Sequence, residues 1–266
     1  MCTLVVIRAK RGPYRLCLAA ARDEDPTRKA APPGLHLVDG VRTIFPMDRL
    51  HGGSWIGCNE HGLVGAVTNW PCQQAGDSAQ SRGLALLAAL GARTIDEATD
   101  RVRGLCEREV VRPFGLFLAR GDDCHWLRGG LGVEGCEQRE LQDDVLVVAN
   151  GVHPQSVEVD GLEAWWQDAA QLPDFDVESV LDRLVVFLVT GRARSRDAGL
   201  PPGVERGADG AWPLCRVTGQ PQSTHATLVA LPRADAPWRL RHAHGNPKVT
   251  DTRDYSWLTL RMLGQA

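Results

Sequence analysis

The segregation of strand-like and helix-like segments into separate blocks constrains the fold of this chain most strongly. Runs of β-branched and apolar residues predict strands over residues 3–7, 14–21, 54–58, 63–68, 114–119, 124–127, 145–149, 226–231 and 238–242. Helical spacing of apolar residues predicts helices over residues 81–90, 94–108, 162–170 and 177–189. Strand blocks separated by helical pairs predict a layered α+β fold, because a parallel α/β fold would alternate single strands with helices. No linker or repeat divides the chain, so we predict one domain over residues 1–266.

Local signals refine three segments. Thr94, followed three residues later by Glu97, predicts a capping box at the start of a helix. The Ala-Ala-Pro-Pro-Gly segment at residues 30–34 predicts a loop, because proline has no N–H to donate to a sheet. The glycine-rich segment at residues 129–132 predicts a turn, since it lacks the lysine and the strand-to-helix setting of a phosphate loop.

The composition excludes several classes of function. Hydrophobic residues make up 43% of the 266 positions and charged residues 24%, an ordinary globular balance that allows a sizeable core. The net charge of -3 argues against nucleic acid as a partner. No apolar run approaches the ~20 residues that span a bilayer, and the apolar start of the chain is too short for a secretory signal. We therefore expect a cytoplasmic protein without membrane insertion.

The eight cysteines show neither a CxxC pair nor zinc-finger spacing. In a reducing cytosol we expect all of them except Cys2 to be buried thiols that pack as small apolar side chains. Cys2 is the exception, because it directly follows the initiator methionine. Removal of Met1 would leave Cys2 with a thiol and a free α-amine, and an amine that titrates near ~7.7–8.0 can act as the base for that thiol. Cys2 is therefore a candidate nucleophile.

Several short motifs follow Cys2 along the chain. Arg22, Asp23 and Glu24 come directly after the second predicted strand. Further motifs are Gly-Gly-Ser-Trp-Ile-Gly at 52–57, Gly-Ala-Val-Thr-Asn at 65–69, Ser-Arg-Gly at 81–83 and Asn-Gly at 150–151. In this order the motifs resemble the NRDE family, the relatives of transport and Golgi organisation protein 2. Two positions depart from the family pattern: Ala21 stands in place of the motif asparagine, and residues 223–227 lack an arginine that relatives tend to carry.

The resemblance implies a fold and a set of site residues. The NRDE family looks related to N-terminal-nucleophile (Ntn) hydrolases of the choloylglycine hydrolase and penicillin V acylase type, which implies a four-layer αββα sandwich. The catalytic residues that it implies are Cys2, Asp23, Asn69 and Asn150. The substrate-binding residues that it implies are Arg22, Trp55, Trp70 and His225.

Each implied role has a physical reason and a structural alternative. Asp23 could orient the α-ammonium group of processed Cys2, Asn69 could donate to an oxyanion, and Asn150 could hold the substrate or the nucleophile. Arg22 could lower the pKa of the thiol by its charge. As alternatives, asparagine is common in turns at strand ends, and Trp55 fits a core position.

Three functions from different classes fit these residues. The first is hydrolysis of a linear amide other than a peptide bond, through thiolate attack and an acyl-enzyme. The second is haem binding or haem trafficking without catalysis, with haem as the ligand and no other cofactor. The third is binding of a lipid or an acyl-CoA related compound. The oligomeric state is left open.

Two alternating histidines, His242 and His244, could share one face of a strand. With another ligand they could bind a metal or a haem iron. A solvated strand end is the simpler interpretation, so we predict no metal site.

Overall fold

A computed structural model describes residues 2–71, 79–151, 153–169, 176–195, 208–217, 221–233 and 236–265. The chain forms two compact units, and each unit collects segments that are distant in sequence. The first unit contains Met1–Pro26 and Asp143–Ser256, and the second contains Thr27–Gln142 and Trp257–Ala266. None of the helices in the described part of the chain has the length and apolar character that a bilayer crossing requires.

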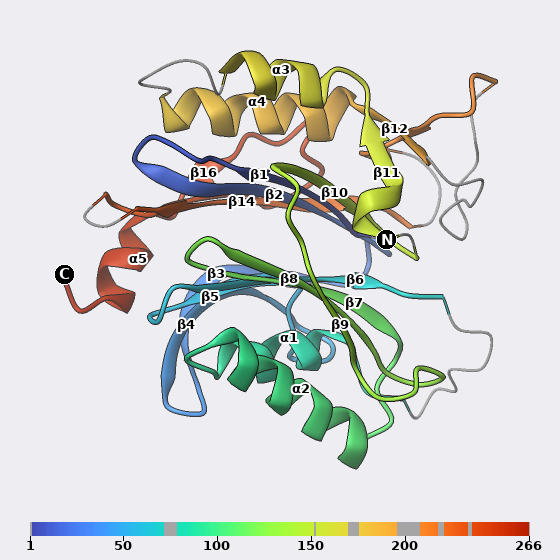
Figure 1. Ribbon diagram of the computed structural model, residues 1–266, viewed down its shortest axis with the longest axis vertical. Coiled ribbons are helices and arrows are strands. Elements are labelled where there is room, and N and C mark those ends of the chain that lie inside the picture. The colour runs from blue at the N-terminus through green and yellow to red at the C-terminus, as the bar shows by residue number, and fades with distance from the viewer. Residues whose placement is uncertain are drawn as a thin grey trace. The chain divides into compact units, whose positions relative to one another are not determined.

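The first unit is built on a six-stranded antiparallel sheet with the order β10-β1-β2-β14-β15-β16. Its strands are β1 (Cys2–Arg8), β2 (Tyr14–Glu24), β10 (Val145–Ala149), β14 (Gln222–Pro232), β15 (Arg239–Ala243) and β16 (Arg253–Asp254). Helices α3 (Leu162–Ala169) and α4 (Val177–Thr190) lie over one face of this sheet (Figure 1). A 3-10 turn, η1 (Pro154–Ser156), leads into a small sheet of β11 (Val157–Val159), β12 (Arg192–Ser195) and β13 (Trp212–Pro213).

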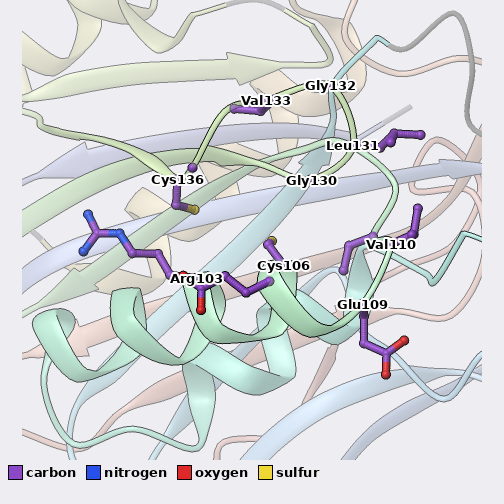
Figure 2. A pocket seen from close by; sticks show the side chains of 12 residues that line it. Arg103, Cys106, Glu109, Val110, Gly130, Leu131, Gly132, Val133 and Cys136 are labelled. Carbon is purple, nitrogen blue, oxygen red and sulfur yellow. The ribbon is translucent and has the colours of Figure 1, made fainter.

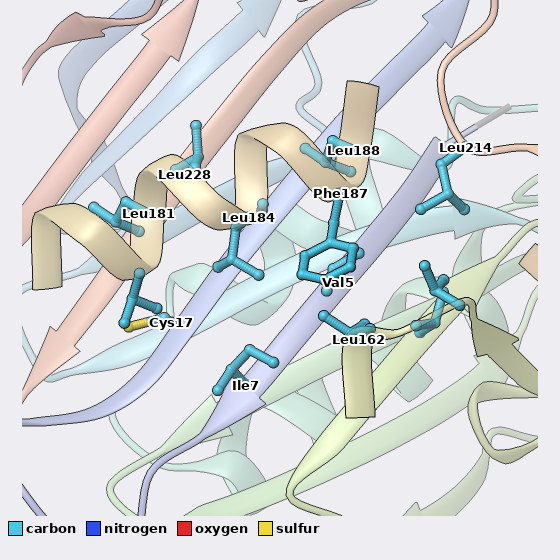
Figure 3. Packing of buried hydrophobic residues seen from close by; sticks show 14 of the residues in the cluster. Val5, Ile7, Cys17, Leu162, Leu181, Leu184, Phe187, Leu188, Leu214 and Leu228 are labelled. Carbon is cyan, nitrogen blue, oxygen red and sulfur yellow. The ribbon is translucent and has the colours of Figure 1, made fainter. Parts of the chain in front are cut away.

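The core of the first unit lies between α4 and one face of the sheet. Leu181, Leu184 and Leu188 of α4 point toward Val5 and other buried residues of the sheet (Figure 3). Val5 and Ile7 are fully buried on this face. Because side chains alternate between faces along a strand, the even-numbered residues of β1, including Cys2, belong to the opposite face.

The second unit is built on a seven-stranded sheet with the order β3-β4-β5-β6-β7-β8-β9. Its strands are β3 (Ala30–Val38), β4 (Val41–Asp48), β5 (Ile56–Asn59), β6 (Leu63–Asn69), β7 (Phe114–Arg120), β8 (Asp123–Gly129) and β9 (Glu137–Glu140). Its helices are α1 (Gly83–Leu90), α2 (Ile95–Arg108) and α5 (Trp257–Met262). Leu86, Leu90 and Val102 of α1 and α2 pack against Phe114 and Leu116 of β7 to form its core.

The predicted α+β class is confirmed, as are the four predicted helices. The cap at the start of α2 is also confirmed, since Thr94 Oγ1 accepts a hydrogen bond from the Glu97 N–H at 3.1 Å. The loop predicted over residues 30–34 is wrong, because these residues begin β3. β3 is an edge strand, and its register shifts between Ala31 and Gly34, so its two prolines occupy an irregular stretch where no ladder N–H is required. The elements that were not predicted from the sequence also include β4, β9, β11, β12, β13, β16 and α5.

The motifs at residues 52–57 and 81–83 contact each other in the second unit through Gly53 and Gly83. A Cβ atom on Gly53 would lie 2.8 Å from the carbonyl carbon of Gly83, and one on Gly83 would lie 2.8 Å from the backbone nitrogen and oxygen of Ser54. The Ser54 N–H also points to the Gly83 carbonyl oxygen at 3.5 Å. Backbone therefore packs directly on backbone, and only glycine leaves room for this contact.

We predict that Gly53→Ala lowers the free energy of unfolding by about 1–3 kcal/mol, because the added methyl group meets backbone that cannot rotate away. Urea unfolding of the purified variant measures this change. The control is Gly104→Ala in α2, where the new Cβ would meet the flexible end of Arg108 at 3.0 Å. Alanine favours a helix by roughly 0.5–1 kcal/mol over glycine, so the control should be neutral or stabilising. Equal stability of Gly53→Ala and the parent protein would contradict the backbone contact.

Candidate functional site

A row of paired residues crosses the end of the six-stranded sheet in the first unit. Cys2 of β1 pairs with Arg22 of β2, and Arg22 pairs with His225 of β14. Asn150 follows β10 directly and completes the row beside Cys2, since Thr3 pairs with Ala149. Paired residues of antiparallel strands project their side chains to the same face, so Cys2, Arg22 and His225 share the face opposite α4. Folding thus assembles four of the eight predicted site residues in this row.

The Cys2 nitrogen has a buried side chain as its hydrogen-bond partner. Its N–H donates to Asn150 Oδ1 at 3.0 Å, and Asn150 is buried. Burial raises the pKa of the Cys2 thiol; the negative charge of Asp23 also raises it, and the positive charge of Arg22 opposes the rise. The thiol is therefore protonated at neutral pH, and a base must remove its proton before the sulfur can attack a carbonyl carbon.

A β-bulge in β14 sets the partners of Arg22. The register shifts between Ser223 and His225, which leaves Thr224 as the extra residue. Arg22 Nη1 donates to Thr224 Oγ1 at 3.2 Å, and the same hydroxyl donates to the Arg22 carbonyl oxygen at 3.1 Å. Arg22 Nη2 also lies 3.8 Å from a carboxylate oxygen of Glu24. These contacts hold the buried guanidinium group beside Cys2.

Asp23 is buried next to Arg22 and belongs to a short chain of hydrogen bonds. Ser223 Oγ donates to Asp23 Oδ1 at 2.5 Å and accepts from the Arg216 N–H at 2.9 Å. Burial raises the pKa of Asp23 to about 6, although the Ser223 hydrogen bond and the charge of Arg216 both oppose this rise. Asp23 therefore changes its charge near neutral pH, in contrast to an ordinary surface carboxyl group. The roles of Ser223 and Thr224 were not predicted from the sequence, because they depend on the register of β14 against β2.

Three histidines gather on the same face of this sheet. One ring nitrogen from each of His225, His242 and His244 lies within 4.8 Å of the others. The His225 and His242 rings stack with centroids 5.6 Å apart, and the His225 and His244 centroids are 4.9 Å apart. Burial, reinforced by the neighbouring positive groups, lowers the pKa of both His225 and His242 to about 3, so both rings are neutral at pH 7. The His-x-His alternation was the sequence signal for two of these residues.

The three remaining predicted site residues belong to the second unit. Asn69 is the last residue of β6 and pairs with Phe114. Trp55 is 4% exposed, which agrees with the core alternative, and its carbonyl oxygen accepts from the Val67 N–H at 2.9 Å. The Trp70 ring has the Arg128 guanidinium group over it, 5.2 Å from the ring centroid. The predicted participation of these residues in a site with Cys2 stays a prediction.

A separate cavity of about 350 Å³ opens in the second unit, between the end of α2 and the predicted turn at residues 129–132 (Figure 2). Cys106 and Cys136 line it, and both thiols are partly exposed. A hydrogen bond from Cys136 lowers the pKa of Cys106 to about 7, and the same interaction raises that of Cys136. The expectation that every cysteine except Cys2 is a buried thiol is therefore wrong for this pair. Cys17, Cys58, Cys124 and Cys215 are buried as expected, and Cys72 lies outside the described residues.

We predict that Asp23→Asn stabilises the protein at pH 8 but not at pH 4. The folded state raises the pKa of Asp23 from the ordinary 3.8 to about 6, so folding opposes its ionisation. The parent protein therefore loses stability as the pH rises from about 4 through 6, by about 3 kcal/mol in total, and an uncharged amide avoids that loss. Urea unfolding at several pH values between 4 and 8 measures the difference. The exposed Asp251, changed to Asn, is the control and should show no such pH-dependent gain. A gain for Asp23→Asn that is independent of pH would contradict the raised pKa.

Comparisons with known proteins identify solved structures with a similar fold. The mutant conjugated bile acid hydrolase from Clostridium perfringens has 9% identity and a TM-score of 0.51, with 96% of each chain covered. Penicillin V acylase from Agrobacterium tumefaciens has 13% identity and a TM-score of 0.50, and the match covers 96% of this chain and 86% of that one. A comparison with curated proteins found no match. The structural likeness confirms the Ntn-hydrolase-like fold that the sequence motifs implied.

The family model for Transport and Golgi organisation 2 matches residues 1–184 of this chain. The matched part begins before Cys2 and includes every motif on which the resemblance was based. It also covers β1, β2 and β10, whose pairing places Asn150 and Arg22 on either side of Cys2. The chain therefore belongs to the Transport and Golgi organisation 2 family, and it has an Ntn-hydrolase-like fold.

Proposed function

We propose that this protein is an Ntn-type cysteine amidohydrolase that cleaves a linear amide other than a peptide bond through Cys2. The observation that carries the proposal is the 3.0 Å hydrogen bond from the Cys2 nitrogen to Asn150 Oδ1. Removal of Met1 would turn this nitrogen into an α-amine, already placed by a buried acceptor. The names of the two solved proteins, a conjugated bile acid hydrolase and a penicillin V acylase, motivate acyl transfer as the reaction class.

The reaction would begin with proton transfer from the Cys2 thiol to its own α-amine. The thiolate then attacks the acyl carbon, and the ammonium group returns a proton to the leaving amine as the carbon–nitrogen bond breaks. A thioester remains on Cys2. Water, deprotonated by the α-amine, attacks this thioester and releases the carboxylic acid and the thiolate. The raised pKa of the Cys2 thiol means that the first step needs a base, and the α-amine of the same residue would supply it.

The neighbours of Cys2 would support these steps. Asn150 positions the α-amine, and the positive charge of Arg22 favours the thiolate over the thiol. Asp23 would balance the α-ammonium group that forms after proton transfer. His225, paired with Arg22, would contact the substrate from the same face of the sheet. From the sequence resemblance we carry over Asn69 as the oxyanion donor, and Trp55 and Trp70 as substrate-binding residues.

We predict that Cys2→Ser lowers kcat/KM for an N-acyl amide by roughly two orders of magnitude or more, because an alkoxide is much harder to form than a thiolate. Turnover is measured on a panel of N-acyl amides, and intact mass spectrometry reports both Met1 removal and the acyl-enzyme. Met1 itself lies outside the described residues. The control is Cys106→Ser, a partly exposed thiol of the second unit, which should keep full activity. Retained Met1 together with no turnover, in protein that binds haem, would instead support the haem-binding alternative.

We predict that Asn69→Ala lowers kcat by roughly 100- to 1000-fold and changes KM little, as expected when a hydrogen-bond donor acts only in the transition state. Steady-state kinetics on the best amide of the panel separates the two constants. Asn246→Ala is the control, because this asparagine bonds to Arg216 and Cys215 and not to Cys2. An increase in KM with unchanged kcat would assign Asn69 to ground-state binding and contradict the oxyanion role.

A further inference from the structure

The histidine cluster of the first unit is a second chemical feature that the proposed hydrolysis does not use as a unit. His225 lies in β14, His242 lies in β15, and His244 follows β15 directly. Ala226 pairs with Ala243, so the next residue pair in the register brings His225 beside His244. His242 pairs with Thr227, two residues further along β14 on the same face. The antiparallel ladder itself therefore brings the three rings together.

We propose that His225, His242 and His244 form a binding site for a divalent first-row transition-metal ion, with Zn²⁺ as the reference ion. Three imidazole groups with one nitrogen each inside a 4.8 Å span are the donor set that such ions prefer. The described group contains no carboxylate, which disfavours Mg²⁺ and Ca²⁺, because those ions require several oxygen ligands. The site does not depend on the proposed function of Cys2.

The geometry is close to that of a three-histidine site. Nitrogen ligands lie about 2.0–2.1 Å from a tetrahedral zinc ion, so they are about 3.3 Å apart. The present span of 4.8 Å requires the donors to draw together by up to about 1.5 Å. His225 and His242 are buried in the sheet, whereas His244 is exposed and lies just after the strand, so rotation of His244 can close the set. Three protein ligands leave a fourth position for water or for an anionic ligand.

Two threonines fix the buried rings in the orientation that a metal site needs. The Thr227 hydroxyl lies 2.9 Å from His242 Nδ1, and the Thr224 hydroxyl lies 3.1 Å from His225 Nδ1. A ring whose Nδ1–H donates to the threonine oxygen carries its lone pair on Nε2, the nitrogen that would then bind the ion. Metal-binding histidines are generally oriented in this way by a partner at the second ring nitrogen. The Tyr255 ring, edge-on to His242 at 6.0 Å, packs against the same cluster.

The charges around the cluster set the kind of ion that fits. Arg22 acts on His225 and disfavours any cation, but the carboxylate of Glu24 lies 3.8 Å from its guanidinium group. Because the ligands are neutral, the bound ion would keep its full double charge, which favours an anionic fourth ligand. This donor set also disfavours soft metal ions that prefer thiolate ligands, because no cysteine belongs to the described group.

The test is equilibrium dialysis and titration calorimetry of the full chain with Zn²⁺. We expect one ion per chain, and at least tenfold weaker binding in His244→Ala. Because His244 is exposed, this variant should keep the fold of the parent protein. His225→Ala should show the same loss. The matched control is His51→Ala, an exposed histidine of the second unit, which should bind as the parent protein does.

Substitution with Co²⁺ distinguishes this site from the thiols. Imidazole ligands give visible d–d absorption without the near-ultraviolet thiolate charge-transfer band, and the spectrum should persist in Cys2→Ser and in the double variant Cys106→Ser, Cys136→Ser. Three results would each overturn the proposal: no binding by the parent protein at about 1 mM Zn²⁺, unchanged binding in both histidine variants, or loss of binding in a cysteine variant instead.

Discussion

The placement of β1 between β10 and β2 is the constraint on which the candidate site depends. Antiparallel pairing fixes every residue of β1 against a partner on each side, so the register that aligns Val5 with Val147 and Ala19 also aligns Cys2 with Arg22 and sets Asn150 beside it. The register is strongly determined because Val5 and Ile7 pack in the core under α4, and a slip by one residue would turn both side chains away from that core. The apolar core of the first unit thereby determines the neighbours of the nucleophile.

The bulge at Thr224 is the second determinant of the site. Without an extra residue, alternate positions of β14 would keep Ser223 and His225 on one face, whereas Arg22 and Asp23 of β2 lie on opposite faces. The bulge lets His225 pair with Arg22 while Ser223 pairs with Asp23. The hydroxyl group of Thr224, the extra residue, forms hydrogen bonds with both Arg22 and the His225 ring. One inserted residue therefore connects the Cys2 row with the histidine cluster, and the two proposed chemistries share Arg22 as a neighbour.

The sequence predicted those parts of the structure that depend on local patterns. The helices 94–108 and 177–189 and the strand 145–149 were found within a few residues, because periodicity and capping by Thr94 are properties of neighbouring residues. Residues 30–34 were predicted as a loop, because Pro32 and Pro33 have no N–H to donate within a sheet. At the edge of a sheet this missing N–H costs little, but the edge position of β3 is a property of the tertiary structure. The thiols of Cys106 and Cys136 were predicted to be buried for a similar reason, since no local pattern shows that α2 brings Cys106 close to Cys136 at a cavity.

By itself, the sequence determined the α+β class, the identity of Cys2 as the candidate nucleophile and the family to which the chain belongs, because segment periodicity and ordered motifs can be recognised without coordinates. Only the tertiary structure decided which side chains meet. In the folded protein Asn150 accepts a hydrogen bond from the Cys2 nitrogen, and burial raises the pKa of Asp23 to about 6. His225 also lies beside His242 and His244. These outcomes join residues far apart in the chain through strand register and burial. Register is set by the packing of the whole sheet, so no local pattern in the sequence contains it.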